Sequence, residues 1–215
     1  MKKNLYSLML SEDVVRAVDA MAHRTGPTRS ALVHQILAEY VNYTTPEQRI
    51  NEVLSAIEQL MAPSRELVPF FSPNSYSMSL KSSLEYKYRP TVKYEVELDR
   101  TGRGVLGELS VIFRTQSAEL IAALTEFFRL WVRIEDAWLA PAMGAQLTCS
   151  LYDGRFVRPI ALPRRECTAG EIAAAISGYV QLFDRLLKGY LGGSLTPRQV
   201  EQAYREDLRR RKLLI

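Results

Sequence analysis

Hydrophobic and polar residues follow clear periods along the chain, and these periods predict most of its secondary structure. Residues 4–10 alternate between two faces, which predicts a short strand. Apolar residues then recur at helical spacing in two segments, with a Gly26-Pro27 turn between them. Ser11 and Thr28 stand where the N-caps of these two helices belong. The first 45 residues are therefore predicted to form strand, helix, turn and helix.

A third helix is predicted after this segment. Thr45 and Gln48 have the spacing of a capping box, and Pro46 occupies the first helical position. Three prolines then fall within residues 62–75, where they interrupt regular structure. We therefore expect a connecting helix and a linker over residues 46–75.

From residue 76 the hydrophobic period changes to two, which is typical of strands. Turn residues such as Asp153-Gly154 separate the alternating segments, and long amphipathic segments follow them. The fold class is accordingly α+β, with a C-terminal domain of β-hairpins and long helices at 76–192 and a basic helix at 193–215. The expected elements are strands at 76–89, 92–98 and 105–113, a helix at 117–139, strands at 145–152 and 155–162, and a helix at 168–190.

An internal repeat is one interpretation of this C-terminal domain. A shift of 52 residues pairs Gly102 with Gly154 and Trp131 with Phe183. Two hairpin-plus-helix units would then form one pseudo-symmetric domain. Chance agreement between two amphipathic helices explains the pairs equally well. The aromatic residues of the strands are expected to pack a core rather than bind a ligand: Tyr76, Tyr86, Tyr88 and Tyr94.

Composition narrows the class of protein. The chain has 215 residues, of which 47% are hydrophobic and 24% charged, as in ordinary globular proteins. It has no run of 18 apolar residues, and charge returns too early at its N-terminus for a signal peptide. Cys149 and Cys167 form no CxxC pattern, so we expect neither a disulfide framework nor a zinc site. These features predict a cytoplasmic protein without membrane contact.

The N-terminal segment is too small to close a core as a monomer. One strand has no partner for its backbone, and about 43 residues bury little surface. Pairing with the same strand of a second chain would satisfy the backbone and cover one face with four helices. Tyr6, Leu8 and Leu10 would point into that shared core. The other face of the two-stranded ribbon would be free, and such a ribbon fits the DNA major groove.

This order of elements and the Gly-x-Ser/Thr-x-Ser turn resemble the Arc/MetJ/CopG ribbon-helix-helix repressors. The resemblance covers residues 2–44 and implies a homodimer that inserts its ribbon into the major groove of double-stranded DNA. The remaining residues match no family that we can name. The segments that carry the resemblance are Lys2-Lys3-Asn4, Leu8-Met9-Leu10-Ser11-Glu12 and Gly26-Pro27-Thr28-Arg29-Ser30-Ala31-Leu32.

By position in the family, Leu5, Ser7 and Met9 would face the bases. Ser7 can hydrogen-bond a base edge, and Leu5 or Met9 can contact a thymine methyl group. The family usually has polar or basic residues at these positions. A dimerisation module without DNA contact, or a ribbon that binds protein, is therefore an alternative.

The start of the second helix is the expected phosphate site. Free N–H groups around Thr28, Arg29 and Ser30 favour an anion, and Lys2 and Lys3 would lie along the DNA backbone. The alternative is that Thr28 and Ser30 only cap the helix and Arg29 is solvated. The chain carries a net charge of +4 with a pI near 9.1, which is compatible with nucleic acid but is no evidence for it alone. The N-terminal segment has a net charge of only about +1, so cooperative or tandem occupancy is plausible.

Nothing in the sequence predicts an enzyme. His23 and His34 lie inside predicted helices, where a structural role is expected. Glu135 and Asp136 are adjacent, so on a helix they point about 100° apart and form a poor acid–base pair. No nucleophile elbow, P-loop or metal-ligand cluster occurs, and the His- and Cys-rich domain of nickel-sensing family members is missing. No cofactor and no metal are expected.

The predicted function is sequence-specific DNA binding by a homodimeric transcription regulator. The C-terminal domain would bind a ligand, a second dimer or a protein partner such as RNA polymerase. A DNA-binding accessory protein of plasmid transfer or partition is the first alternative, and an antitoxin or pure interaction module is the last. The basic run Arg209–Lys212 is either a second phosphate-binding patch or, as we favour, a solvated tail in which Arg205 pairs with Glu201.

Overall fold

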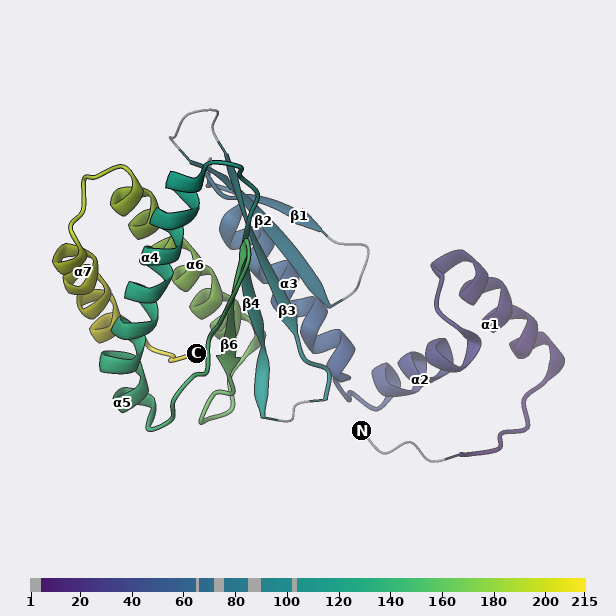
Figure 1. Cartoon of the computed structure of the whole chain (residues 1–215). Helices are drawn as coiled ribbons and strands as arrows, with labels where there is room; N and C mark the ends of the chain where they lie inside the picture. Colours follow the sequence, from purple (N-terminus) through teal and green to yellow (C-terminus); the bar gives the residue numbers. More distant parts are fainter. Residues whose placement is uncertain (1–4, 65, 72–75, 85–89, 102–103) are drawn as a thin grey trace. The chain divides into compact units, whose positions relative to one another are not determined.

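In the computed structural model the chain forms two compact units, Met1–Arg49 and Ile50–Ile215 (Figure 1). The structure describes residues 5–64, 66–71, 76–84, 90–101 and 104–215. The first unit holds helices α1 (Glu12–Thr25) and α2 (Arg29–Tyr40), and helix α3 (Pro46–Met61) begins in it and continues into the second unit. Each unit is described by itself below.

Both helices predicted for the first unit form, and the end of α1 and the start of α2 have the expected chemistry. Gly26 ends α1 with a φ of +88°, which a glycine adopts without strain, and its N–H donates to the Ala22 carbonyl oxygen. The Thr28 hydroxyl oxygen accepts a hydrogen bond of 3.3 Å from the Ala31 N–H and so caps α2. Ser11 stands at the N-cap of α1, but its side chain makes no capping hydrogen bond.

The strand expected at residues 4–10 does not form in the single chain. Residues 5–10 have no regular secondary structure and are exposed on both faces of the predicted alternation. Leu5 has 98% of its surface exposed and Leu8 has 61%. The physical reason is that a strand needs a neighbour for its N–H and C=O groups, and none of the described residues of the chain pairs with this segment. Asn4 lies outside the described residues.

The second unit is built on one six-stranded antiparallel sheet with the strand order β1-β2-β3-β4-β6-β5. Mixed helices and antiparallel strands confirm the α+β class. The strands are β1 (Val68–Phe71), β2 (Ser77–Ser83), β3 (Thr91–Leu98), β4 (Val105–Phe113), β5 (Ser150–Tyr152) and β6 (Arg155–Ala161). The helices after the sheet's first strands are α4 (Ala118–Ile134), α5 (Ala140–Met143), α6 (Ala169–Leu191) and α7 (Pro197–Arg210).

One face of the sheet carries the core and the other is polar. Alternate residues of β3 are buried, from Val92 to Leu98, while Lys93 and Glu95 on the other parity are partly exposed and form an ion pair. The Tyr94 hydroxyl donates a 2.9 Å hydrogen bond to Asp184 of α6, so α6 covers the apolar face. This period-two burial is the predicted pattern.

The helices form a layer over that apolar face (Figure 1). Phe128 of α4 stacks on Phe156 of β6 with ring centroids 5.0 Å apart. Gln181 of α6 donates to the Met61 sulfur, which places the end of α3 beside α6. The Trp138 Nε1–H donates to Glu201 of α7 at 2.9 Å, so α7 packs on the helices. The core therefore lies between the sheet and these helices.

The long helix expected at 117–139 forms with one change. After α4 the backbone widens into a π-helical segment, η1 (Glu135–Leu139), in which the Ala140 N–H donates to the Glu135 carbonyl oxygen five residues before it. Pro141, which has no N–H, follows in α5. Such π-bulges are rare insertions in α-helices.

Two boundaries differ from the prediction. The expected linker at 62–75 contains β1, which pairs with β2 at the edge of the sheet. An edge strand tolerates Pro69 because one of its sides needs no ladder hydrogen bonds. The strand expected at 145–152 begins only at Ser150. Tyr94 and, in part, Tyr76 pack in the core as predicted, and Tyr86 and Tyr88 lie outside the described residues.

The proposed duplication stays a hypothesis. The strand order puts the β3–β4 hairpin beside the β6–β5 hairpin, and Trp131 and Phe183 contact each other with ring centroids 4.6 Å apart. However, β5 has three residues whereas β3 has eight. Gly102, one partner of the glycine pair, lies outside the described residues.

Candidate functional site

The residues predicted to read DNA bases lie in the irregular segment before α1. Leu5, Ser7 and Met9 are all exposed, and no intrachain hydrogen bond of the Ser7 side chain is found among the described residues. Lys2 and Lys3 lie outside the described residues. The segment is thus accessible, and the single chain does not order it into a ribbon.

The predicted phosphate residues come together on the first turn of α2. Thr28 is the N-cap, Arg29 is the first helical residue and Ser30 follows it, all exposed or partly exposed. The Thr28 hydroxyl already caps the Ala31 N–H. The first turn also carries the positive end of the helix dipole, so the local geometry suits an anion.

Arg29 has an intramolecular partner that the sequence did not reveal. Its Nε and Nη2 groups donate to the two carboxylate oxygens of Asp19 on α1. The Arg29 and Asp19 side chains remain 61% and 40% exposed. An exposed ion pair of this kind contributes about 0–1 kcal/mol, so a phosphate can compete for the guanidinium. Ten residues separate the two, and only the packing of α1 against α2 brings them together.

The first unit leaves most of its apolar side chains exposed. Its buried hydrophobic residues, among the described positions 5–49, are Ala22, Leu32 and Ala38. Large exposed apolar areas are typical of surfaces that another molecule covers. The exposed large hydrophobic residues are Leu5, Tyr6, Leu8, Met9, Leu10, Val14, Met21, Ile36, Leu37, Tyr40, Val41 and Tyr43.

The two histidines do not form a site. His23 lies in α1 and His34 in α2, and both are exposed. Over the part of the chain that the structure describes, no group of three or more His, Cys, Asp or Glu side chains is placed to hold a metal ion.

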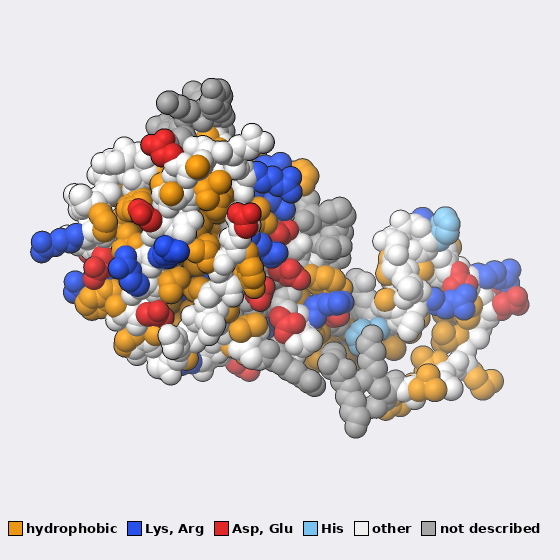
Figure 2. Space-filling model, viewed as in Figure 1, with side chains coloured by type: hydrophobic (Ala, Val, Ile, Leu, Met, Phe, Trp, Pro, Cys, Tyr) orange, Lys and Arg blue, Asp and Glu red, His pale blue; other side chains and the backbone are white. Residues whose placement is uncertain are grey.

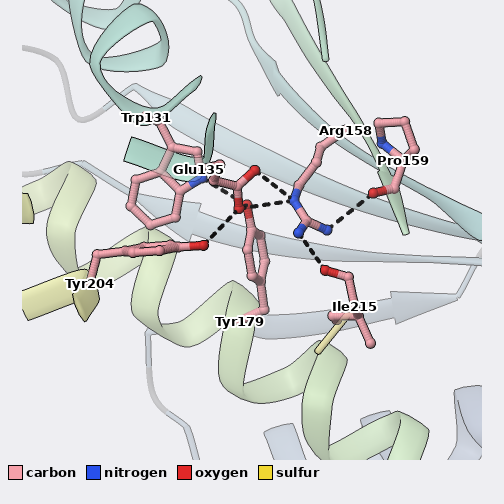
Figure 3. A network of polar contacts seen from close by, with 7 residues as sticks. All are labelled: Trp131, Glu135, Arg158, Pro159, Tyr179, Tyr204 and Ile215. Carbon is pink, nitrogen blue, oxygen red and sulfur yellow. Dashed lines mark hydrogen bonds and ion pairs between the residues drawn. The ribbon is translucent and has the colours of Figure 1, made fainter. Parts of the chain in front are cut away.

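A buried polar network joins the helices to the sheet of the second unit (Figure 3). Arg158 of β6 donates its Nε–H to both carboxylate oxygens of Glu135, at 3.1 and 3.0 Å. The hydroxyls of Tyr179 and Tyr204 donate to Glu135 Oε1 at 2.9 and 3.3 Å. The remaining contacts are Trp131 Nε1 to the Tyr179 hydroxyl at 2.7 Å, Arg158 Nη1 to the Pro159 carbonyl oxygen at 3.1 Å, and Arg158 Nη2 to the Ile215 main-chain oxygen at 2.5 Å.

The electrostatics keep Arg158 charged and both tyrosines of this network neutral. Burial alone would lower the pKa of Arg158, but the adjacent Glu135 carboxylate outweighs it and raises that pKa. Burial raises the pKa of both Tyr179 and Tyr204, and the negative Glu135 raises it further. Both tyrosines therefore stay neutral donors to Glu135.

Sequence reasoning had set Glu135 aside because Asp136 is next to it. In the structure Glu135 is buried and Asp136 is exposed. The hydrophobic pattern of the sequence contained a signal for this buried network. Glu135 follows an apolar helix face, and Arg158 occupies an inward-facing position of β6, so each is a charge at a core position.

The basic C-terminal run is not a uniformly solvated tail. Arg211 packs over the rings of Tyr179 and Tyr204 and pairs with Asp207. The predicted ion pair between Arg205 and Glu201 does not form. Glu201 accepts the Trp138 Nε1–H, and the Arg205 guanidinium lies 3.9 Å from the Trp138 ring centroid. The arginines use their planar groups to cover aromatic rings.

No helix within the described ranges has the length and apolar character needed to cross a membrane. Comparison with protein-family models, with curated proteins and with solved structures gave no match for this chain.

Proposed function

We propose that the protein is a sequence-specific DNA-binding transcription regulator that acts as a homodimer through residues 1–45. The observation that carries the proposal is the exposed apolar surface of the first unit, next to an unpaired alternating segment at residues 5–10. Both features are accounted for if a second copy supplies the missing strand and the missing half of the core.

The expected dimer would form by antiparallel pairing of residues 5–10 with the same residues of the second copy. Tyr6, Leu8 and Leu10 would then lie against apolar residues of the α1 and α2 helices, such as Val14 and Leu37. Full burial of one such side chain contributes about 1.5–3 kcal/mol. Several side chains from each copy suffice to offset the cost of association, which is about 4–15 kcal/mol.

The ribbon would present Leu5, Ser7 and Met9 to the major groove. The first turn of α2, with Thr28, Arg29 and Ser30, would contact a phosphate beside it. In this arrangement the Arg29 guanidinium is shared between Asp19 and the phosphate. Asp19 therefore weakens the phosphate contact of each subunit. Several subunits on adjacent sites would together supply the affinity.

The test is binding to DNA from the protein's own genetic neighbourhood, by gel shift with excess competitor and then footprinting. Sedimentation of the free protein gives its mass in parallel. A dimer that protects a discrete site with repeated half-sites supports the proposal. A site at a promoter indicates regulation, whereas a site at a transfer or partition origin indicates an accessory factor. A monomer, or binding to any DNA alike, contradicts the proposal.

A further inference from the structure

The second unit contains a cavity that the proposed DNA binding does not use. It lies between α4 and the β5–β6 hairpin and has a volume of about 620 Å³. Pockets that bind small molecules commonly have volumes of about 300–1,000 Å³. Figure 2 shows hydrophobic side chains exposed on this face of the unit, with Lys or Arg side chains beside them.

The walls of the cavity are apolar and fixed by the core. Phe128 of α4 and Phe156 of β6 lie at its base, fully buried and stacked on each other, so the base of the cavity is held in place. Leu151 lines it from β5, which is the last strand of the sheet, and Tyr190 lines it from α6. An edge strand leaves the cavity open on one side, and Leu151 is accordingly 40% exposed.

Two positively charged side chains lie at this cavity. Arg129 and Arg133 line it from α4, and residues four apart lie on the same face of a helix. Both side chains are exposed, and within the described residues neither guanidinium forms an ion pair or a hydrogen bond. Glu126 also lines the cavity, so its lining has a net charge of one positive unit.

We propose that this cavity binds a small organic monoanion, with its apolar body against Leu151 and Tyr190 and its carboxylate on Arg129 and Arg133. The planar guanidinium matches a carboxylate with two parallel hydrogen bonds. One excess positive charge matches one carboxylate better than a doubly charged phosphate.

The experiment is calorimetric titration of the full chain, without DNA, with decanoate and with 2-naphthoate. Decanol and 2-naphthol are the uncharged counterparts. At least one anion is expected to bind at least about tenfold more tightly than its counterpart, since charged hydrogen bonds are the stronger ones. The double substitution Arg129→Gln with Arg133→Gln should weaken anion binding by at least about tenfold.

The matched control is Arg185→Gln. Arg185 is an exposed arginine of α6 without an ion pair among the described residues, and it does not line the cavity. Arg185→Gln removes the same kind of charge away from the cavity, so anion binding should not change. The single substitutions Arg129→Gln and Arg133→Gln give the same test if the double variant fails to fold. Equal binding of acids and uncharged counterparts, no binding of either acid at millimolar concentration, or equal losses in the control would overturn the proposal.

Cys149 gives a second readout because it lines the same cavity. The bound acid should slow alkylation of Cys149, as measured by mass spectrometry of its peptide. Unchanged alkylation under saturating acid would place the ligand elsewhere and overturn the assignment. Since the inference rests on the cavity alone, its failure leaves the proposed DNA binding untouched, and the reverse also holds.

Discussion

Arg158 and Glu135 form an ion pair whose side chains are 0% and 4% exposed. Glu135 comes from the π-helical segment η1 and Arg158 from β6. The tyrosines of α6 and α7 and the Ile215 main-chain oxygen complete their hydrogen bonds. The pair thus joins η1, β6, α6, α7 and Ile215 at one point. A buried pair with satisfied hydrogen bonds specifies one arrangement of these segments.

Loss of one partner should be far more costly than loss of both. Arg158→Met leaves Glu135 as a buried charge and should lower the free energy of unfolding by about 3–5 kcal/mol. The double variant Arg158→Met with Glu135→Gln removes both charges, and it should recover part of that loss. Urea unfolding monitored by circular dichroism measures both effects.

The control is Lys93→Met, which breaks the partly exposed pair between Lys93 and Glu95. It should change the free energy of unfolding by about 1 kcal/mol or less. If Arg158→Met costs no more than this control, the buried pair does not organise the unit.

This network also marks the limit of what the sequence could predict. The β3 and β4 strands and the α6 helix follow from the hydrophobic period, and the start of β6 follows from the turn residues Asp153-Gly154, all of which are local signals. The pairing of Glu135 with Arg158 depends on the strand order, which no local pattern contains. The ion pair of Asp19 with Arg29 likewise depends on the packing of α1 against α2, which no local pattern contains.

Two further differences have similar causes. The β1 strand has four residues and includes Pro69, so its own propensity is poor, and pairing with β2 decides its structure. Residues 5–10 have a clear period of two and yet no strand forms in the single chain. A hydrophobic period of two shows which side chains would share a face of a strand. The strand itself forms only when a partner strand accepts its backbone hydrogen bonds.

The two faces of residues 5–10 should respond differently to a charge. Leu8→Glu places a carboxylate on the face expected to be buried between two copies, and it should convert the dimer to a monomer. Leu5→Glu places the same charge on the opposite face and should leave the dimer intact. Sedimentation at several concentrations measures the mass of each variant. Dissociation by Leu5→Glu but not by Leu8→Glu would mean that the faces are reversed.

Ser7 should contribute to site preference rather than to folding. Ser7→Ala removes the hydroxyl that would contact a base edge, and it should change the relative affinity for variant sites by about 1–3 kcal/mol at one base position. The melting temperature should hardly change, because Ser7 is exposed in the free chain. Binding to a randomised pool followed by sequencing measures the preference. A large fall in melting temperature would instead place Ser7 inside the dimer.

Arg29 and Asp19 should act on DNA affinity in opposite directions. Arg29→Ala should weaken binding to all sequences alike and reduce the salt slope by about 1, since one phosphate contact is lost. Asp19→Asn removes the partner that holds the Arg29 guanidinium, and it should strengthen binding to any DNA. Gel-shift titrations at several salt concentrations measure both. An unchanged slope in Arg29→Ala would remove this residue from the interface.

The capping box of α6 should make part of the stability depend on pH. Hydrogen bonds from the Arg165 guanidinium and the Thr168 backbone N–H, at 2.6 and 2.9 Å, lower the pKa of Glu171 to about 2. A carboxyl group whose pKa is lower in the folded state stabilises the fold above its unfolded pKa. That contribution is lost as the pH falls from about 4.5 towards 2.

Glu171→Ala should therefore lower the melting temperature at pH 7, and its difference from the unchanged protein should shrink as the pH falls through this window. The matched control is Gln199→Ala in the capping box of α7, where Thr196 and Gln199 make the same reciprocal hydrogen bonds without a charge. Its effect should not vary over the same pH range, because Gln199 does not titrate. Thermal melts of both variants between pH 7 and pH 2 separate the charge from the cap. If the effects of Glu171→Ala and Gln199→Ala on the melting temperature changed with pH in the same way, the Glu171 carboxylate would contribute only as a neutral cap.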